Sequence, residues 1–426
     1  MLDLKMIRST PEAVKEAVRK RGKDMDGEID RILAVDAARR EAASRADSLK
    51  AEQNRASKQI PQIKKEGGDA GELMARMKSL SAQIKDCGAQ ADALEKELRD
   101  LLLSLPNLPD SDVCAGGKEN NVPLRVYGQP PRFDFPAKNH VELCESLGLI
   151  DYQRGAKIAG AGSWLYRGWG ARLEWALLNF FVAEHLADGY ELVLPPHMLG
   201  YECGYVAGQF PKFEEEVYWI ENPTSSDRKF MLPTAETALV NLHRDEILDR
   251  ADLPRKYIAY TPCYRREAGS YRSEERGMIR GHQFNKVEMV QYTAPEQSDA
   301  AFEELVAKAE RLVQKLGLHY RLSKLAAGDC SFSMARTYDI EVWIPSMGIY
   351  KEVSSASNAR DYQARRGNVK YRGEDQKLHL VHTLNASGLA TSRVLPAIVE
   401  QCQNPDGSVT VPEVLRPYLG IDVIRP

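Results

Sequence analysis

The sequence predicts an α+β fold, with an antiparallel β-sheet core and surrounding helices, preceded by an N-terminal antiparallel α-helical coiled-coil arm. Apolar residues recur at alternating steps of four and three between about residues 28 and 105, whereas strand-like segments follow one another beyond residue 110. The segment 104–112, with two prolines and several turn-forming residues, separates the two regions. We therefore expect an N-terminal domain at 1–110, with its helical hairpin at about 28–104, and a second domain at 111–426.

The hairpin prediction depends on a 3.5-residue period sustained over several heptads, which is typical of coiled coils. Smaller residues in the first helix would face larger ones in the second and let the two helices approach closely. The expected core positions of the first helix are Ala42, Ala46, Leu49, Gln53, Ala56, Ile60 and Ile63, and those of the second are Leu73, Met77, Leu80, Ile84, Cys87, Ala91, Leu94, Leu98, Leu101 and Leu105.

The turn of the hairpin is expected at Gly67 and Gly68, because glycine commonly ends a helix, and Asp69 is a suitable N-cap for the second helix. Pro61 lacks an amide hydrogen and clashes with the preceding turn, so it should kink or end the first helix near the tip. Each helix would be roughly 50 Å long at about 1.5 Å per residue.

The second domain is expected to contain an antiparallel sheet, because its strand-like segments succeed one another without regularly alternating helices. These segments are YELVLPP, KYIAYTPCYRR, HQFNKVEMVQY and YDIEVWIP. A helix is expected at 294–316, opened by Pro295 and followed by Gly317.

Composition excludes several classes of protein. The 426 residues contain no run of about 18 apolar residues, and the charged N-terminus lacks a signal-peptide core, so we expect a cytoplasmic protein. The seven cysteines are scattered without a C-x-x-C pair, so we expect neither a disulfide framework nor a structural zinc site. His379 and His382 have no carboxylate motif around them, which favours ordinary core or surface histidines over metal ligands.

Positive charge is concentrated near the expected tip of the hairpin, although the whole chain has a net charge of −3. Five basic residues between positions 49 and 65 stand against a single acid, Glu52. A solvated helix face is the ordinary interpretation of such a run, and RNA binding is the alternative. The five are Lys50, Arg55, Lys58, Lys64 and Lys65.

Candidate catalytic residues lie at 261–288. No Walker A sequence and no glycine-rich dinucleotide fingerprint is present, so a nucleotide site must be of another kind. Arg265 and Glu267, two apart in a predicted strand, would project to one face, where Arg265 could bind a phosphate and Glu267 an amino group. Phe284 could stack on a purine, and Glu288 lies further along the next strand. A structural ion pair is the alternative interpretation of these charges.

Several segments resemble the class II aminoacyl-tRNA synthetases, and specifically the bacterial-type seryl-tRNA synthetases. Tyr264-Arg265-Arg266-Glu267 resembles motif 2, the segment 388–393 resembles motif 3, and 190–196 resembles motif 1. Further segments that resemble seryl-tRNA synthetases occur over essentially the whole chain, including the opening segment and the hairpin. They are PTAET at 233–237, NLHRDEIL at 241–248, HQFNKVE at 282–288, KEVSSASNARDYQARR at 351–366, HTLNASGLA at 382–390 and PEVLRPYLG near the end.

The resemblance implies an ATP-dependent serine–tRNA ligase that forms AMP and diphosphate, with domain 1–110 binding tRNA and 111–426 catalysing the reaction. It implies catalytic roles for Arg265, Glu267 and Arg393, Mg²⁺ binding by Glu352 and Ser355, and contacts of the basic hairpin residues with tRNA(Ser). A homodimer joined through motif 1 is also implied, and whether tRNA(Sec) is a further substrate stays open. The implied ATP-binding residues are Arg265, Arg266, Glu267, Phe284, Glu352, Val353, Ser354, Ser355 and Arg393. The implied serine-binding residues are Thr234, Ala235, Glu236, Arg265, Glu288, Asn385 and Ser387.

Three alternatives stay open from the sequence. One is a catalytically silent, synthetase-like RNA-binding protein, although Arg265, Glu267 and Arg393 are all present. Another is an amino acid:carrier protein ligase, which would lack the long arm. The third is a specialised, antibiotic-tolerant copy of the enzyme. Departures from the family pattern motivate the third, namely Pro61, Gly281 in place of a larger residue, Ala356, Ala359 and the acidic motif 2 loop with Glu274 and Glu275.

Overall fold

The computed structural model describes residues 1–221, 227–267 and 277–426, apart from the side chain of Lys64. The acidic motif 2 loop, with Glu274 and Glu275, lies outside the described residues. The chain divides into two compact units. One comprises residues 2–19 and 23–106, and the other comprises residues 1, 20–22 and 107–426.

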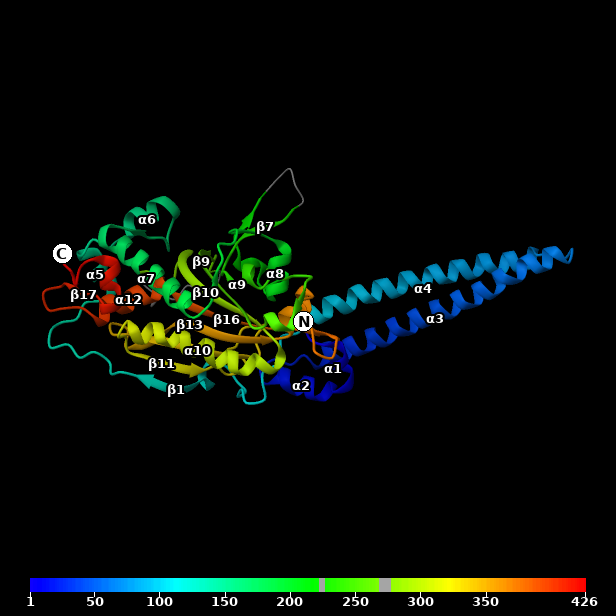
Figure 1. The fold of residues 1–426 in the computed structure, drawn as a ribbon, viewed down its shortest axis with the longest axis horizontal. Helices are drawn as coiled ribbons and strands as arrows, with labels where there is room; N and C mark the ends of the chain where they lie inside the picture. Colours follow the sequence, from blue (N-terminus) through cyan, green and yellow to red (C-terminus); the bar gives the residue numbers. More distant parts are fainter. Residues whose placement is uncertain (222–226, 268–276) are drawn as a thin grey trace. The chain divides into compact units, whose positions relative to one another are not determined.

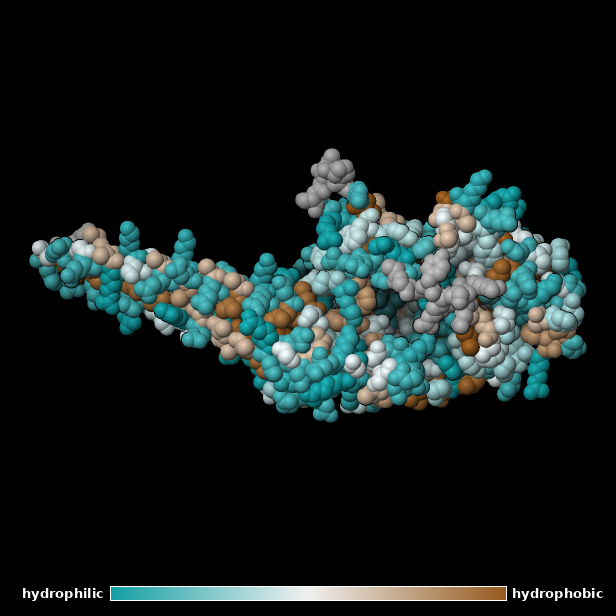
Figure 2. Space-filling view, turned by 180° about the vertical axis from the view of Figure 1, so that it is seen from behind, coloured by the Kyte–Doolittle hydropathy of each residue, from teal (hydrophilic) through white to brown (hydrophobic). Residues whose placement is uncertain are grey.

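The first unit contains the predicted helical hairpin (Figure 1). Its long helices are α3 (Asp26–Lys65) and α4 (Gly71–Ser104), preceded by the short α1 (Leu4–Ser9) and α2 (Pro11–Arg19). The heptad prediction is confirmed, because every expected core position is at least partly shielded from solvent and Ala46, Leu80 and Leu98 are buried. Hydrophilic residues cover most of the hairpin surface in view in Figure 2, with apolar residues between the two helices.

The turn of the hairpin differs in detail from the prediction. Helix α3 passes through Pro61 and ends four residues later, so the proline does not end the helix. Gly67 has a φ of 74°, the left-handed conformation that glycine adopts most easily at the end of a helix. Asp69 accepts a hydrogen bond from the Gly71 amide at 2.8 Å, although the N-cap position itself is occupied by Ala70.

The second unit is built on the predicted antiparallel sheet. Eight strands lie in the order β1-β11-β12-β13-β16-β10-β9-β4, and every neighbouring pair is antiparallel except β4 and β9. The strands are β1 (Val122–Tyr127), β4 (Glu191–Leu192), β9 (Arg255–Tyr264), β10 (Gln283–Thr293), β11 (Tyr320–Lys324), β12 (Arg336–Ile344), β13 (Ile349–Arg360) and β16 (His382–Ala390).

Three helices contribute the main apolar core against this sheet. Helix α7 (Gly168–Ala187) contacts β9 and β10, α10 (Ser298–Lys315) contacts β13 and β16, and α12 (Thr391–Gln401) contacts β10, β12 and β13. The expected helix at 294–316 is thus present, as a short 3₁₀ turn followed by α10. It buries residues at helical spacing, among them Phe302, Leu305, Val306, Ala309 and Val313, so one apolar face covers the sheet.

Shorter elements surround the sheet. The helices are α5 (His140–Ser146), α6 (Tyr152–Ala159), α8 (Tyr201–Ala207), α9 (Glu236–Leu239), α11 (Tyr362–Gly367) and α13 (Arg416–Leu419). Small sheets are formed by β2 (Ile150–Asp151) with β3 (Leu165–Tyr166), by β5 (Met198–Gly200), β6 (Trp219–Ile220) and β7 (Lys229–Met231), by β8 (Ile247–Asp249), β14 (Lys370–Arg372) and β15 (Leu378–Leu380), and by β17 (Val409–Thr410) with β18 (Val423–Ile424). Within the described part of the chain, no helix has the length and apolar character needed to cross a bilayer.

Candidate active site

Two adjoining cavities lie over the central strands of the sheet. The larger has a volume of about 390 Å³, and the smaller about 70 Å³. Strands β10, β13 and β16 supply side chains to both, and Arg393 at the start of α12 lines the smaller one. Five residues line both cavities, so the two form one continuous site: Arg265, Glu267, Lys286, Glu352 and Ser387.

The larger cavity contains a network of carboxylates around one amide. The Asn385 side-chain amide donates to Glu288 at 2.9 Å and to Glu236 at 3.3 Å. The Lys286 ammonium forms an ion pair with Glu288 at 2.5 Å and donates to the Thr234 hydroxyl at 2.7 Å. These groups form a negatively charged recess in which one cation is already bound by a carboxylate and a hydroxyl.

The two carboxylates differ in their surroundings. Desolvation, and then the charge of Glu288, raise the pKa of Glu236 from its ordinary value to about 7. Gln363 partly offsets this effect by donating to Glu236 at 2.8 Å. Glu236 is therefore a group whose charge changes near neutral pH, whereas Glu288 is paired with Lys286.

Arg265 and Glu267 lie together in the site, but for a reason that differs from the sequence prediction. Strand β9 ends at Tyr264, and Glu267 has a φ of 51°, so strict alternation along a strand does not orient the two side chains. Arg265 is held by its amide, which donates to the His282 carbonyl, and by its guanidinium, which donates to the Pro233 carbonyl at 3.2 Å. Glu267 forms an ion pair with Arg280.

The smaller cavity has the character of a nucleotide site. Phe284 lines it and lies 5.2 Å from the Arg265 guanidinium carbon, measured to the centre of its ring. Arg393 donates to the Glu352 carbonyl at 2.8 Å and lies 3.3 Å from the Glu352 carboxylate. The cavity thus combines an aromatic face with three guanidinium groups, those of Arg265, Arg280 and Arg393, which suits a purine joined to phosphates.

Hard oxygen donors suitable for Mg²⁺ lie along one side of the larger cavity. Ser355 donates its hydroxyl hydrogen to Asp339, its direct partner in the β12–β13 register, which leaves the hydroxyl oxygen lone pairs available. Desolvation and the charge of Glu352 raise the pKa of Asp339 well above its ordinary value. Desolvation opposes ionisation of Glu352 as well, but Arg393 and Arg265 hold its pKa below its ordinary value. Two neighbouring carboxylates and a hydroxyl oxygen therefore fit a divalent cation, although no group of three or more His, Cys, Asp or Glu side chains with metal-site geometry occurs among the described residues.

Most of the expected site residues line the two cavities, and three do not. Val353 lines the smaller cavity. Arg266 is turned outward and donates to the Glu215 carbonyl, Ala235 is fully buried, and Ser354 donates to the Ser387 carbonyl beneath the site. Of the two histidines considered as metal ligands, His379 pairs with Asp375 at 2.9 Å.

Among the residues that the sequence analysis missed are Lys286, which lines both cavities, and Asp339 and Gln363, which form hydrogen bonds with Ser355 and Glu236. Lys286 could have been found, because it lies two residues before Glu288 in a strand and therefore shares its face. Asp339 is adjacent to Ser355 only through the cross-strand register, and Gln363 reaches Glu236 through tertiary packing. Neither relation is visible in the sequence.

Gly281, which departs from the family pattern, lines the smaller cavity. A β-carbon at this position would overlap the indole of Trp164 and would lie 2.8 Å from the Gly162 carbonyl. Trp164 thus fills the space that a side chain at position 281 would need.

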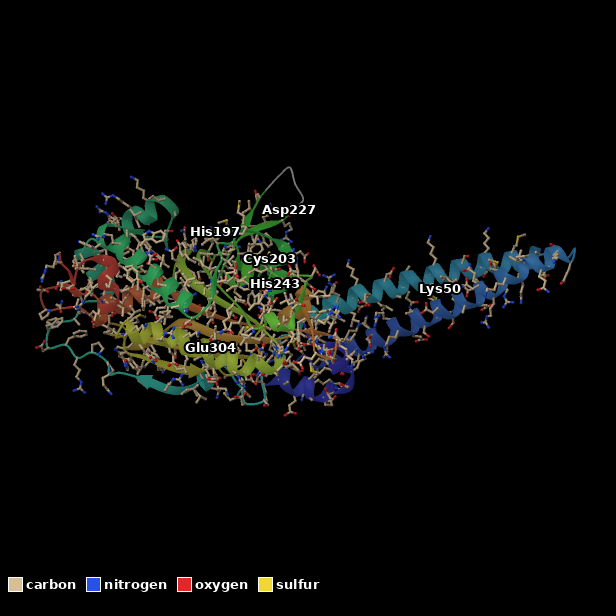
Figure 3. All side chains as sticks on the ribbon, viewed as in Figure 1. Lys50, His197, Cys203, Asp227, His243 and Glu304 are labelled. Atoms are coloured by element: carbon tan, nitrogen blue, oxygen red, sulfur yellow. The ribbon has the colours of Figure 1, made fainter. Side chains whose placement is uncertain are left out.

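The basic residues expected to contact tRNA lie on α3. Lys50, Arg55, Lys58 and Lys65 are exposed, and Figure 3 labels Lys50 on this helix. The Lys64 side chain lies outside the described residues. Glu52, the single acid of this segment, pairs with Arg76 of α4 at 2.5 Å, so its charge is already neutralised.

Segments in both parts of the chain match families of known proteins. Residues 1–109 match the family described as the seryl-tRNA synthetase N-terminal domain. Residues 218–402 match the tRNA synthetase class II core domain (G, H, P, S and T), and this segment contains all the candidate active-site residues.

Full-length relatives agree with these two matches. Serine–tRNA ligase 2 of Clostridium acetobutylicum is 59% identical over 99% of this chain and all of its own length. The seryl-tRNA synthetase of Pyrococcus horikoshii, solved in complex with ATP, has a TM-score of 0.95 and 34% identity, with both chains fully covered. The cytoplasmic serine–tRNA ligase of Naegleria fowleri, in complex with AMP, has a TM-score of 0.88 and 29% identity over 100% of this chain and 99% of its own. The chain therefore belongs to the seryl-tRNA synthetases, a family of class II aminoacyl-tRNA synthetases.

Proposed function

We propose that this enzyme activates L-serine with ATP, giving seryl-adenylate and diphosphate, and then transfers the seryl group to the 3′ end of tRNA(Ser) with release of AMP. The observation that carries the proposal is the continuity of the two cavities through Arg265. A polar recess lined by Thr234, Glu236 and Glu288 opens directly onto an aromatic, arginine-lined cavity.

Serine recognition is assigned to the carboxylate network. Glu288 and Thr234, which hold the Lys286 ammonium, provide the oxygen acceptors that a substrate ammonium requires. Glu236, Asn385 and Ser387 line the same cavity and provide polar partners for the serine hydroxyl. Because a site built to hydrogen-bond a hydroxyl leaves its buried polar groups unpaired with alanine, rejection of alanine by about 10⁴-fold is expected.

ATP positioning is assigned to Arg265, Phe284 and Arg393. Phe284 offers a face for the adenine ring, and Glu267 an acceptor for the adenine amino group. Arg265 and Arg393 lie where the phosphates would follow, so they can neutralise charge that develops during the reaction. Glu352 and Ser355 would hold Mg²⁺, which when bound neutralises part of the phosphate charge.

The first step, which forms seryl-adenylate, requires alignment of the reactants rather than a general base. The serine carboxylate already carries the attacking electron pair, so it needs only to be held in line with the α-phosphorus. A new bond forms between this oxygen and phosphorus, and the bond to diphosphate breaks. The terminal ribose hydroxyl of tRNA then attacks the seryl carbonyl, the hydroxyl proton passes to the departing phosphate, and AMP leaves with the electrons of the broken bond.

The helical hairpin is assigned to tRNA binding, with residues 1–110 as the tRNA-binding domain and 111–426 as the catalytic domain. The exposed cations of α3 can bind the phosphate backbone without reading its sequence. Charging of tRNA(Sec) is expected if the helical shape of this tRNA also lets its phosphate backbone bind the exposed cations of α3.

A homodimer is proposed through the motif 1 segment. Leu192, Leu194 and Met198 are 40%, 74% and 61% exposed, and Trp175 on α7 is also exposed. Neighbouring apolar side chains of this kind are typical of a surface that a partner subunit covers. Sedimentation of the full chain as a monomer at micromolar concentration would contradict this assignment.

The activity is tested by ATP–diphosphate exchange with each of the twenty amino acids, with Mg²⁺ and without tRNA. We expect exchange with serine far above that with alanine, threonine or cysteine. No exchange with any amino acid would support a silent RNA-binding protein. Exchange with serine but transfer to a carrier protein instead of tRNA would support the carrier ligase.

A further inference from the structure

Part of the lining of the larger cavity is formed by residues 331–334, here called the pocket wall. Ser331, Phe332, Ser333 and Met334 all line the cavity, as do Thr234 and Asn385. The pocket wall belongs to the connection between β11 and β12. Its position therefore helps to define the space in which substrate binds.

Arg21 forms hydrogen bonds with main-chain carbonyls of this connection. Its side chain is almost fully buried, with 7% exposure, and desolvation lowers its pKa. The guanidinium donates to the carbonyls of Cys330 at 3.1 Å and Ser331 at 3.3 Å, and also to that of Met334. The Ala327 carbonyl accepts from it at 3.2 Å. Because four of the five carbonyls that accept from this cation belong to the connection between β11 and β12, displacement of that connection would leave a buried charge with too few partners.

Asn107 holds the remaining carbonyls of the pocket wall. Its backbone amide donates to the Phe332 carbonyl at 2.9 Å, and its side-chain amide donates to the Ser333 carbonyl at 2.9 Å. The Arg21 guanidinium in turn donates to the Asn107 carbonyl at 2.8 Å. Every main-chain carbonyl of residues 330–334 thus accepts a hydrogen bond from Arg21 or Asn107.

These two residues lie beside points where the chain passes between the units. Arg21 lies between α2, which ends at Arg19, and α3, while Asn107 follows α4 by three residues. Both belong to the catalytic unit. The packing beside them is tight, because a β-carbon on Gly328 would lie 2.6 Å from the Gly116 carbonyl and 3.1 Å from the Arg21 carbonyl. A change in the backbone at Arg21 therefore has little room to be absorbed locally.

We propose that Arg21 and Asn107 are positioning residues that fix the pocket wall and couple serine binding to the state of the helical hairpin. The inference rests on the proposed function, since it assigns the cavity to serine and the hairpin to tRNA. An RNA that restrains the hairpin also restrains the chain segments that enter and leave it. These segments contain Arg21 and Asn107, the two residues that hold the pocket wall. Coupling between binding sites is reciprocal, so bound seryl-adenylate should also tighten tRNA binding.

The test compares Arg21→Lys and Asn107→Ala with wild type in the full-length protein. Lysine keeps the charge of Arg21 but cannot reach the same set of carbonyls. Arg172→Lys is the matched control, because Arg172 donates to the Leu419 carbonyl at 2.8 Å and lines neither cavity. The readouts are the serine KM and the ATP KM in diphosphate exchange, and the Kd of tRNA(Ser) with and without 5′-O-(seryl)sulfamoyladenosine.

In wild type we expect the analogue to tighten tRNA binding about fivefold or more. Each positioning variant should raise the serine KM about tenfold or more, change the ATP KM less, and reduce the effect of the analogue on tRNA binding to nearly none. The control should behave as wild type. Thermal unfolding of each variant establishes that it is folded at the assay temperature, and Asn107→Ala replaces Arg21→Lys if the latter is not.

Two outcomes would overturn the inference. One is a wild-type serine KM together with a wild-type analogue effect in the folded variants. The other is a wild-type enzyme whose tRNA affinity the analogue leaves unchanged. Absence of serine-dependent exchange in wild type would instead contradict the proposed function, so failure of the two proposals can be told apart.

Discussion

Glu236 and Glu288 share the side-chain amide of Asn385, which donates to both carboxylates within 3.3 Å. Glu288 is also paired with Lys286, whereas Glu236 is not, and the pKa of Glu236 is raised to about 7 by desolvation and the charge of its neighbour. Glu236 therefore changes its charge close to physiological pH, whereas Glu288 forms an ion pair with Lys286.

The first prediction concerns pH. The ionised form of Glu236 is the stronger acceptor for the serine hydroxyl, so serine binding should weaken as the pH falls through about 7 and strengthen above it. Glu236→Gln should raise the serine KM about 10–100-fold at pH 8 and remove this pH dependence. The measurement is the serine KM in diphosphate exchange from pH 6 to pH 9. An unaltered pH profile in the variant would contradict the assignment.

The second prediction concerns Lys286. Replacement by methionine leaves Glu288 without its cation inside the cavity, and removal of one partner of such a pair commonly costs about 3–5 kcal/mol. Lys286→Met should therefore lower kcat/KM for serine by more than about 100-fold and move the acid limb of the pH profile to higher pH. Lys286→Arg, which keeps the charge, is the control and should retain the position of that limb.

The third prediction separates the nucleotide cavity from the serine cavity. Phe284→Ala removes the aromatic face and should raise the ATP KM by about tenfold, because stacking of a base on an aromatic ring contributes about 1–3 kcal/mol. The serine KM should change much less, since Phe284 lines the smaller cavity and is not among the described residues that line the larger one. Phe284→Tyr should restore the ATP KM. Equal increases in both constants would indicate a general disturbance of the site.

The fourth prediction concerns the hairpin. Alanine at Lys50, Arg55, Lys58 and Lys65 together should weaken tRNA(Ser) binding and reduce the dependence of its Kd on salt, because fewer counterions are released on binding. Diphosphate exchange without tRNA should stay unchanged. Lys377→Ala serves as the control, because the Lys377 side chain is 79% exposed on the catalytic unit. Fluorescence anisotropy of labelled tRNA over a salt series measures both effects.

The parts of the fold with a strong period were predictable from the sequence. Heptad spacing identified α3 and α4, and the four predicted strand segments, where β-branched and aromatic residues gather between turns, overlap β4, β9, β10 and β12. Strands β1, β11, β13 and β16 of the main sheet were not predicted. The continuation of α3 past Pro61 was not predicted. Contacts along the hairpin can support a helix through a proline that would end an isolated helix.

The candidate site was predictable mainly where a motif was continuous in the sequence. Arg265, Glu267 and Phe284 were identified in this way, although the conformation of Glu267 shows that the assumed strand alternation was wrong. Asp339 and Gln363 depend on pairing between distant strands and helices, which composition and spacing do not encode. The outward orientation of Arg266 likewise depends on a contact with Glu215, which is distant in the sequence.

The packing of Trp164 against Gly281 ties together two positions that a residue-by-residue alignment would treat as independent. A larger residue transplanted to position 281 from another synthetase would collide with the indole, and a small residue at 164 alone would open a void beside the smaller cavity. Sequence exchange between this enzyme and its relatives must therefore carry both positions as a pair. Replacing the two residues one at a time would pass through a less stable or less active protein. Each residue of the pair is therefore expected to change less readily in evolution than it would alone.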